Sequence, residues 1–297
     1  MRLLVIGTNG QLALSLLERG LSQGIEVISI GRPEIDLARD TSLDALVAGA
    51  RPDAVVNAAA YTAVDKAESE PELACAVNGR GAGLVAAAAA ATGAPVVHIS
   101  TDYVFDGTAT RPYREDDPVA PLGVYGASKL AGERAVAAAT PDYAILRTAW
   151  VYSPFGHNFV RTMLRLAETR DELGVVADQR GSPNSALDLA DGIIAVACNL
   201  AQRPGDADLR GTFNLTADGE ASWAEFATEV FLISARLGGP NARVRAIATS
   251  DYPTPARRPA YSCLDGTKLA ERHGIRLPDW RIPLETTIRR LVMADPQ

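Results

Sequence analysis

Apolar residues in the first half of the chain come in short runs that alternate with longer segments of helical periodicity. The runs are rich in valine and isoleucine and lack strict apolar–polar alternation, which is typical of strands buried on both faces of a parallel sheet. Strands separated by helices indicate βαβ units. We therefore expect strands over 2–7, 26–31, 53–60, 95–101 and 143–152, and helices over 10–24, 41–50, 72–92 and from Tyr125 onward.

After residue 150 this rhythm loosens, and proline and glycine become frequent. A doubly wound parallel (Rossmann-type) α/β sheet that binds a dinucleotide is therefore expected for residues 1–150. Residues from about 186 to 215 are expected to return to this domain. Residues 151–185 and 216–297 are expected to form a smaller C-terminal lobe that binds the substrate over the carboxyl ends of the strands.

Composition and charge narrow the classes of function. The formal net charge of −7 gives no general attraction to nucleic acid or to an anionic membrane. The three cysteines and three histidines are scattered and form no CxxC pair, which argues against a disulfide framework or a zinc site. No signal peptide is evident, and the longest apolar run, 84–91, is too short to span a bilayer. We expect a cytoplasmic protein.

The first strand–helix turn reads VIGTNGQLA, with Gly7 and Gly10 between strand and helix. Glycines at this point let the backbone turn tightly and approach a pyrophosphate, which is then held by amides at the helix N-terminus. A plain strand–helix connection would need no ligand. The position directly after an N-terminal strand favours dinucleotide binding.

The second predicted strand ends in ISIGRPEIDL, without the acidic residue that usually holds the ribose 2′-hydroxyl of NAD. Arg32 stands there instead and is suited to a 2′-phosphate. NADPH is thus the expected cofactor, with NADH as the alternative, and Asp36 and Leu37 should lie near the adenine.

Three residues together suggest acid–base chemistry. Thr101 ends a predicted strand, where ligands bind in open α/β sheets. Tyr125 precedes Lys129 by four residues, which places both on one face of a helix. A nearby ammonium would lower the pKa of the phenol, and so we expect Tyr125 to be an acid tuned by Lys129. YxxxK pairs are common on helix surfaces. A glycine-rich turn, a threonine at a strand end and a YxxxK pair, in this order along one chain, are a more specific signal.

These residues resemble the extended short-chain dehydrogenase/reductases, and within them the dTDP-4-dehydrorhamnose reductases. The similarity runs along essentially the whole chain and is strongest in VVNAAAYTAVDKAESEPELA, STDYVFDG, VYGASKLAGE, LRTAWVY and PTPARRP. The resemblance implies NADPH-dependent reduction of the C4 keto group of a dTDP-linked 4-keto-6-deoxy-hexose. The implied reaction gives dTDP-L-rhamnose for cell-surface polysaccharide.

The resemblance also implies roles for individual residues. The catalytic trio would be Thr101, Tyr125 and Lys129. The cofactor would contact Gly7, Asn9, Gly10, Gln11, Leu12, Arg32, Asp36, Leu37, Ala58, Ala60, Tyr125 and Lys129. The substrate would contact Thr101, Asp102, Val104, Trp150, Asn158, Phe159, Gln179 and Arg258.

Departures from related families bear on the reaction. Related dehydratases have Asp-Glu after the threonine, whereas here Asp102 is followed by Tyr103, which favours reduction over dehydration. Some family members share magnesium across a dimer through glutamates, but this chain has Ser15 and Leu187 at the corresponding places. No metal site is therefore predicted, and a monomer or weak homodimer is expected.

Two other functions stay open at this point. A nucleotide-sugar epimerase of this fold would keep NAD tightly bound. A non-enzymatic NADP-binding regulatory subunit would have no need for an intact Thr101, Tyr125 and Lys129.

Overall fold

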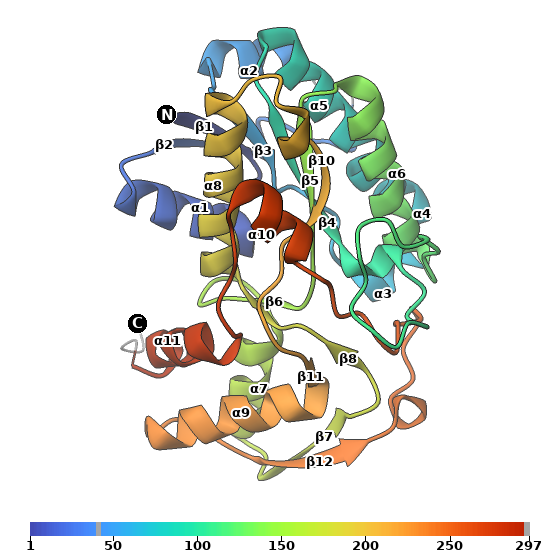
Figure 1. The fold of residues 1–297 in the computed structure, drawn as a ribbon. Helices are drawn as coiled ribbons and strands as arrows, with labels where there is room; N and C mark the ends of the chain where they lie inside the picture. Colours follow the sequence, from blue (N-terminus) through green and yellow to red (C-terminus); the bar gives the residue numbers. More distant parts are fainter. Residues whose placement is uncertain (40–42, 294–297) are drawn as a thin grey trace.

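The structure is a computed structural model that describes residues 1–39 and 43–293. The start of the helix expected over 41–50 and the last four residues of the expected lobe lie outside the described residues. The centre of the molecule is a six-stranded parallel sheet in the order β10-β5-β4-β3-β1-β2 (Figure 1). Its strands are β1 (Arg2–Ile6), β2 (Glu26–Ile30), β3 (Ala54–Asn57), β4 (Val96–Thr101), β5 (Tyr143–Thr148) and β10 (Gly211–Asn214).

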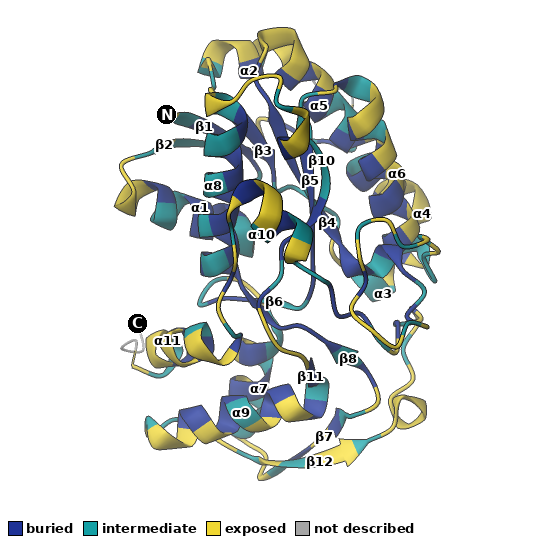
Figure 2. Cartoon of the chain, viewed as in Figure 1, coloured by how far each residue is buried: buried dark blue, intermediate teal, exposed yellow. Residues whose placement is uncertain are grey.

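Helices cover both faces of the sheet, as its Val- and Ile-rich strands require. Figure 2 shows buried residues concentrated in the strands and on the inward sides of these helices. The expected class, a doubly wound Rossmann-type α/β sheet, is confirmed. One face carries α1 (Gln11–Ser22) and α8 (Ala186–Gln202), and the other carries α2 (Leu43–Ala50), α4 (Pro71–Cys75), the π-helix η1 (Ala76–Arg80), α5 (Gly81–Thr92) and α6 (Val124–Ala139).

A smaller group of elements lies beyond the carboxyl ends of the strands (Figure 1). Its aromatic residues join the same hydrophobic core as β1 and α1, and so sheet and lobe are packed as one body. Its elements are β6 (Val151–Tyr152), α7 (Phe159–Ala167), β7 (Glu172–Val176), β8 (Arg180–Gly181), β9 (Asn184–Ser185), β11 (Ala221–Ser222), α9 (Trp223–Arg236), β12 (Arg243–Ile247) and α11 (Arg281–Val292). Short connecting turns complete the chain: α3 (Val64–Ala67), η2 (Asp102–Val104), η3 (Ala207–Leu209), η4 (Thr249–Asp251) and α10 (Thr267–His273).

Two segments after residue 185 pack on the sheet. Strand β10 pairs in parallel with β5 at the sheet edge, and α8 packs against α1. The range expected for the lobe, 216–297, also includes α10, which instead contacts β10 and α8. Lys268 of α10 donates to the carbonyl of Thr212 and lies over the ring of Phe213, which ties this helix to the edge strand.

The strand expected over 143–152 is broken in the structure. Strand β5 ends at Thr148, and β6 begins at Val151. Between them Trp150 adopts a positive φ of 44°, which a non-glycine residue rarely adopts and which turns the chain away from the sheet. Asn184 fixes this turn, because its side chain donates to the carbonyl of Ala149 and its backbone to that of Trp150.

The alanine-rich helix is longer than its central apolar run suggests. Because η1 joins α4 to α5, Pro71–Thr92 is continuous and, by length and composition alone, long and apolar enough to cross a membrane. The sequence predicted this helix over 72–92, but the bilayer-spanning length was judged from the run 84–91 alone. Half of an 18-residue window in this segment is buried inside the protein, where the helix packs on α6 and α2. A buried core helix passes the same test of length and composition.

Candidate active site

A cavity of about 1050 Å³ lies over the carboxyl ends of the strands, between the sheet and the smaller lobe. Open α/β sheets bind ligands in this position. Most of the residues expected from the sequence line this one cavity. They are Gly7, Asn9, Gly10, Gln11, Leu12, Arg32, Asp36, Leu37, Ala58, Ala60, Thr101, Asp102, Tyr125, Lys129, Trp150 and Asn158.

The turn between β1 and α1 is built for close backbone approach. Gly7 has a φ of 121°, and a β-carbon there would lie 3.3 Å from the backbone nitrogen of Ala59. Gly10 is the N-cap of α1, where a β-carbon would point into open space. No side chain caps this helix, and its first turn carries no acidic residue. Its N-terminal amides are therefore available to an anion, which fits the pyrophosphate of a dinucleotide.

The cavity extends past the end of β2. Arg32 is exposed there, and Leu37, also in the lining, is buried. The Asp36 carboxylate accepts a hydrogen bond from the backbone of Ala38 and faces Arg39 at 3.6 Å, so it shapes this turn. An exposed guanidinium at this end of the cavity fits a 2′-phosphate better than a bare ribose hydroxyl.

The expected catalytic residues come from two elements. Thr101 ends β4 and caps the turn η2, accepting from the backbone of Tyr103 at 3.2 Å. Its hydroxyl donates to Oδ1 of Asp102 at 2.9 Å. Tyr125 and Lys129 lie one turn apart on α6, and both line the cavity. Gly126 lets this helix approach η2, since a β-carbon there would lie 2.2 Å from the carbonyl oxygen of Tyr103.

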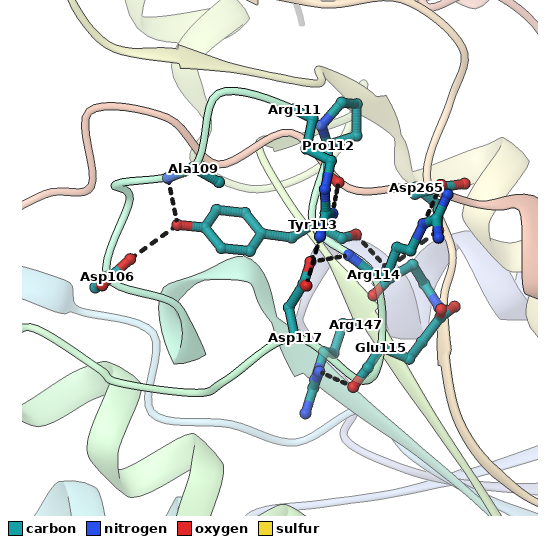
Figure 3. A network of polar contacts seen from close by, with 11 residues as sticks. Asp106, Ala109, Arg111, Pro112, Tyr113, Arg114, Glu115, Asp117, Arg147 and Asp265 are labelled. Atoms are coloured by element: carbon teal, nitrogen blue, oxygen red, sulfur yellow. Dashed lines mark hydrogen bonds and ion pairs between the residues drawn. The ribbon is translucent and has the colours of Figure 1, made fainter.

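The loop between η2 and α6 is held by a polar network (Figure 3). The Tyr113 hydroxyl donates to Asp106 at 2.9 Å and accepts from the backbone of Ala109. Arg111 binds both carboxylate oxygens of Asp117, at 2.7 and 2.8 Å. The ring of Tyr113 also stacks on Phe105. This network fixes the segment that connects η2 to α6, so the side chains that these two elements carry meet on a rigid frame.

The pKa values of Tyr125 and Lys129 differ from the expectation. Lys129 is only 2% exposed, and its ammonium donates to the carbonyl of Ile99 at 2.6 Å. Burial lowers the pKa of Lys129 to about 8. Burial also raises the pKa of Tyr125 to about 12, against the opposing effect of the Thr101 hydroxyl. The expected lowering of the Tyr125 pKa by Lys129 is therefore wrong here, because desolvation is the largest influence on both groups.

A buried ion pair behind Lys129 had no sequence signal. Glu133, one turn further along α6, receives two hydrogen bonds from Arg147 at 2.8 and 2.9 Å, and both side chains are about 5% exposed. Ser100 donates to the same carboxylate at 2.6 Å. The negative charge of Glu133 acts to raise the pKa of Lys129, partly offsetting burial. Only the fold brings β4, β5 and α6 together in this way.

An aromatic wall forms the lobe side of the cavity. The rings of Trp150 and Trp223 stack in parallel, with centroids 3.4 Å apart and planes 5° apart. Gly181 packs so closely that a β-carbon there would lie 2.4 Å from Cε2 of Trp150. Trp223, the first residue of α9, also lines the cavity, although the sequence singled out only Trp150. Because Trp223 covers one face of Trp150, that face does not meet the cavity.

Four residues expected at the substrate lie outside the cavity lining. Val104 is fully buried in a core cluster, and Phe159 packs against Trp223. Gln179 is buried and donates to Thr249. The Arg258 guanidinium binds both oxygens of the Asp65 carboxylate, at 2.8 and 3.1 Å.

The acidic, cysteine and histidine side chains form no metal centre in the part of the chain that the structure describes. Among residues 1–39 and 43–293, no group of three or more His, Cys, Asp or Glu side chains is placed to hold a metal ion. At the two positions considered for magnesium, Ser15 is buried and Leu187 belongs to the core.

Comparisons with known proteins agree with this site. Residues 1–293 match the family model described as RmlD substrate binding domain. The dTDP-4-dehydrorhamnose reductase of Sinorhizobium fredii NGR234 is 51% identical over 294 residues, which cover 99% of this chain and 97% of that protein. The dTDP-4-dehydrorhamnose reductase of Escherichia coli K12 is 42% identical, with 98% of each chain covered.

Solved structures of dTDP-4-dehydrorhamnose reductases are also similar to this chain over nearly its whole length. The dTDP-4-dehydrorhamnose reductase of Clostridium acetobutylicum has a TM-score of 0.89 at 40% identity and covers 98% of this chain and 99% of its own. The Bacillus anthracis enzyme, solved in complex with NADP, also scores 0.89, at 36% identity, and covers 96% and 98%. A UDP-glucose 4-epimerase of Thermus thermophilus scores 0.78 at 20% identity, covers 98% and 99%, and shares the fold.

Proposed function

The chain belongs to the dTDP-4-dehydrorhamnose reductase family, and we propose that it reduces the C4 keto group of dTDP-4-dehydro-L-rhamnose to dTDP-L-rhamnose with NADPH. This would be the last step in making the activated sugar for cell-surface polysaccharide. The observation that carries the proposal is the shared cavity, where the uncapped amides of α1 face the same space as Thr101, Tyr125 and Lys129.

The residues at the carboxyl ends of the strands fit a bound dinucleotide. The amides after Gly7, including those of Asn9, Gly10, Gln11 and Leu12, would hold its pyrophosphate, and Ala58 and Ala60 would pack beside it. Arg32 would bind the 2′-phosphate, with Asp36 and Leu37 near the adenine. NADPH, when bound, supplies the hydride for the reaction.

The protein's own part of the chemistry is to supply a proton to the developing alkoxide. Because the pKa of Tyr125 is about 12, its phenol keeps its proton at neutral pH and can donate it. Thr101 would hydrogen-bond to the same oxygen. Lys129 holds its charge below pH about 8 and would contact the ribose and the phenol side of the site.

The lobe would bind the nucleotide sugar. Trp150, Asp102 and Asn158 line the cavity and would contact it directly. Arg258 would reach the diphosphate from the cavity border, and Val104, Phe159 and Gln179 would support the pocket from behind. We further propose that the protein acts in the cytoplasm as a monomer or weak homodimer, without a need for magnesium.

The first test is loss of NADPH absorbance when the protein is mixed with dTDP-4-keto-6-deoxy-hexose and the upstream 3,5-epimerase. We expect oxidation of NADPH with formation of dTDP-L-rhamnose by NMR, equally with magnesium and with a chelator. Absence of oxidation by a folded, NADPH-binding protein would refute the proposal.

Replacing Tyr125 tests the assignment of the acid. Tyr125→Phe removes the proton donor but keeps the ring, so turnover should fall by about 10²–10⁴-fold while NADPH affinity changes little. Tyr143→Phe, on β5 away from the cavity, is the matched control and should behave as wild type. Near-normal turnover in Tyr125→Phe would show that another group supplies the proton.

A further inference from the structure

Thr101 has one hydroxyl proton, and both the Asp102 carboxylate and a substrate oxygen would need it. The hydroxyl donates to Oδ1 of Asp102 and accepts from the backbone of Tyr103, and it also acts to lower the pKa of Tyr125. If Asp102 is ionised, its carboxylate can only accept, so the Thr101 proton must point toward it. Thr101 then has no proton left to donate to a substrate oxygen.

Asp102 is placed where it can also be neutral. It is 2% exposed, and its Oδ2 is buried without a hydrogen-bond partner among the described residues. Burial raises the pKa of this carboxyl to about 6, against the opposing effect of the Thr101 hydroxyl that donates to it. A buried, incompletely satisfied carboxylate favours its neutral form, which can donate a hydrogen bond.

We propose that Asp102 is a positioning residue whose neutral form donates to Thr101 and thereby turns the Thr101 hydroxyl toward the carbonyl oxygen being reduced. The ionised form withdraws that hydroxyl and leaves Tyr125 as the sole donor. The inference rests on the proposed function, and it adds a pH-dependent donor to the same site. No proton is consumed by Asp102 itself, because the proton transferred to the alkoxide comes from Tyr125.

Other titratable groups lie close enough to be considered. Tyr103, in the same turn, and Tyr125, on α6, interact electrostatically with Asp102. Lys129 lies one turn beyond Tyr125, and His157 lines the same cavity. The charge of Arg258 acts to lower the pKa of Tyr103, and that of Asp65 acts to raise it. A pH effect in the wild type alone would not identify Asp102, so the test must remove its titration selectively.

Asp102→Asn makes this separation. Its amide cannot ionise, yet it can donate to Thr101 as the neutral carboxyl does. In the wild type, kcat/KM for the sugar should fall from an upper to a lower plateau, by about tenfold, as pH rises through the pKa of Asp102. In Asp102→Asn the step should vanish, so that kcat/KM no longer falls between pH 5 and pH 8. Thr101→Val should stay at or below the lower plateau at every pH.

The measurement is NADPH oxidation from pH 5 to 8, with the dissociation constant of NADPH determined at each pH by its fluorescence. Asp188→Asn is the matched control, because burial also raises the pKa of Asp188 to about 6 but it lies on α8 outside the cavity lining. This control should keep the wild-type step. Circular dichroism would establish that each variant is folded.

The outcomes separate the two proposals. A wild-type protein that oxidises no NADPH refutes the proposed function. An active wild type without a step, or a step that Asp102→Asn retains, overturns the role of Asp102. If Asp102→Asn fails to fold, Thr101→Val decides the matter, since a wild-type-like step in that variant shows that the titration acts without the Thr101 hydroxyl.

Discussion

At the scale of single residues, Lys129 shows how the site trades stability for function. It is 2% exposed, and within the described chain its ammonium is held by the Ile99 carbonyl rather than by a paired carboxylate. Removing a charge from water costs free energy that one hydrogen bond does not restore. The lowered pKa of Lys129 expresses that cost, because burial favours its neutral form in the folded protein.

This cost predicts a pH-dependent stability. The pKa of Lys129 is about 8 in the folded protein and 10.5 in its ordinary state, so between these values the unfolded chain binds more protons and the wild type gains stability as pH rises. Lys129→Met has no such titration. Relative to it, the wild type should gain up to about 3 kcal/mol between pH 7 and pH 10.5.

Urea unfolding of both proteins at pH 7 and pH 10.5 measures this difference directly. Lys129→Met should also lose most of its reductase activity at pH 7. A constant difference in unfolding free energy across that range would show that the Lys129 ammonium is well solvated or paired after all.

At the scale of elements, the order of strands and helices follows from local patterns. Runs of Val and Ile predicted the parallel sheet, and Gly7 and Gly10 predicted the position of the tight turn between β1 and α1. The break at Trp150 was missed, because a positive φ held by Asn184, distant in the sequence, leaves no local signal. Trp223 was missed for a related reason: Ser222 and Glu225 form a capping box, so the segment reads as an ordinary helix start.

The start of α9 makes a prediction of its own. Trp223 covers one face of Trp150 and should hold that ring in place beside the sugar. Trp223→Leu should therefore raise KM for the sugar nucleotide roughly tenfold, ~1.4 kcal/mol, with little effect on the dissociation constant of NADPH. A fall in KM would instead mean that Trp223 competes with substrate for the face of Trp150.

Tryptophan fluorescence gives a second measurement for this variant. The chain has three tryptophans, and Trp280 is fully buried in the core. In Trp223→Leu, any remaining change on adding dTDP should come from Trp150. Leu232→Ala, an exposed position on the same helix, is the control and should leave both KM and the fluorescence response unchanged.

At the scale of the whole molecule, one ion pair joins distant parts of the chain at the edge of the site. Asp65, at the start of α3, binds Arg258 and also accepts from the backbone of Ala256, so it ties the C-terminal loop to the sheet domain. The Arg258 hydrogen bond holds the pKa of Asp65 below its ordinary value. Such long-range pairing has no local pattern, which is why the family resemblance suggested Arg258 as a substrate contact but nothing in the sequence indicated its partner Asp65.

The Asp65–Arg258 pair predicts opposite effects for its two members. The charge of Arg258 acts to lower the pKa of Tyr103, which lines the cavity, so the guanidinium is close to the site. Once released from Asp65, it would bind the diphosphate of the substrate. Asp65→Asn should then lower KM for the sugar nucleotide, and Arg258→Met should raise it, with kcat nearly unchanged in both. Because the pair is partly exposed, the loss of stability should stay within about 1 kcal/mol. The double variant should match Arg258→Met, since Asp65 acts only through Arg258. If KM rises in Asp65→Asn as much as in Arg258→Met, the pair serves to hold the loop closed, and Arg258 reaches the substrate only through that closure.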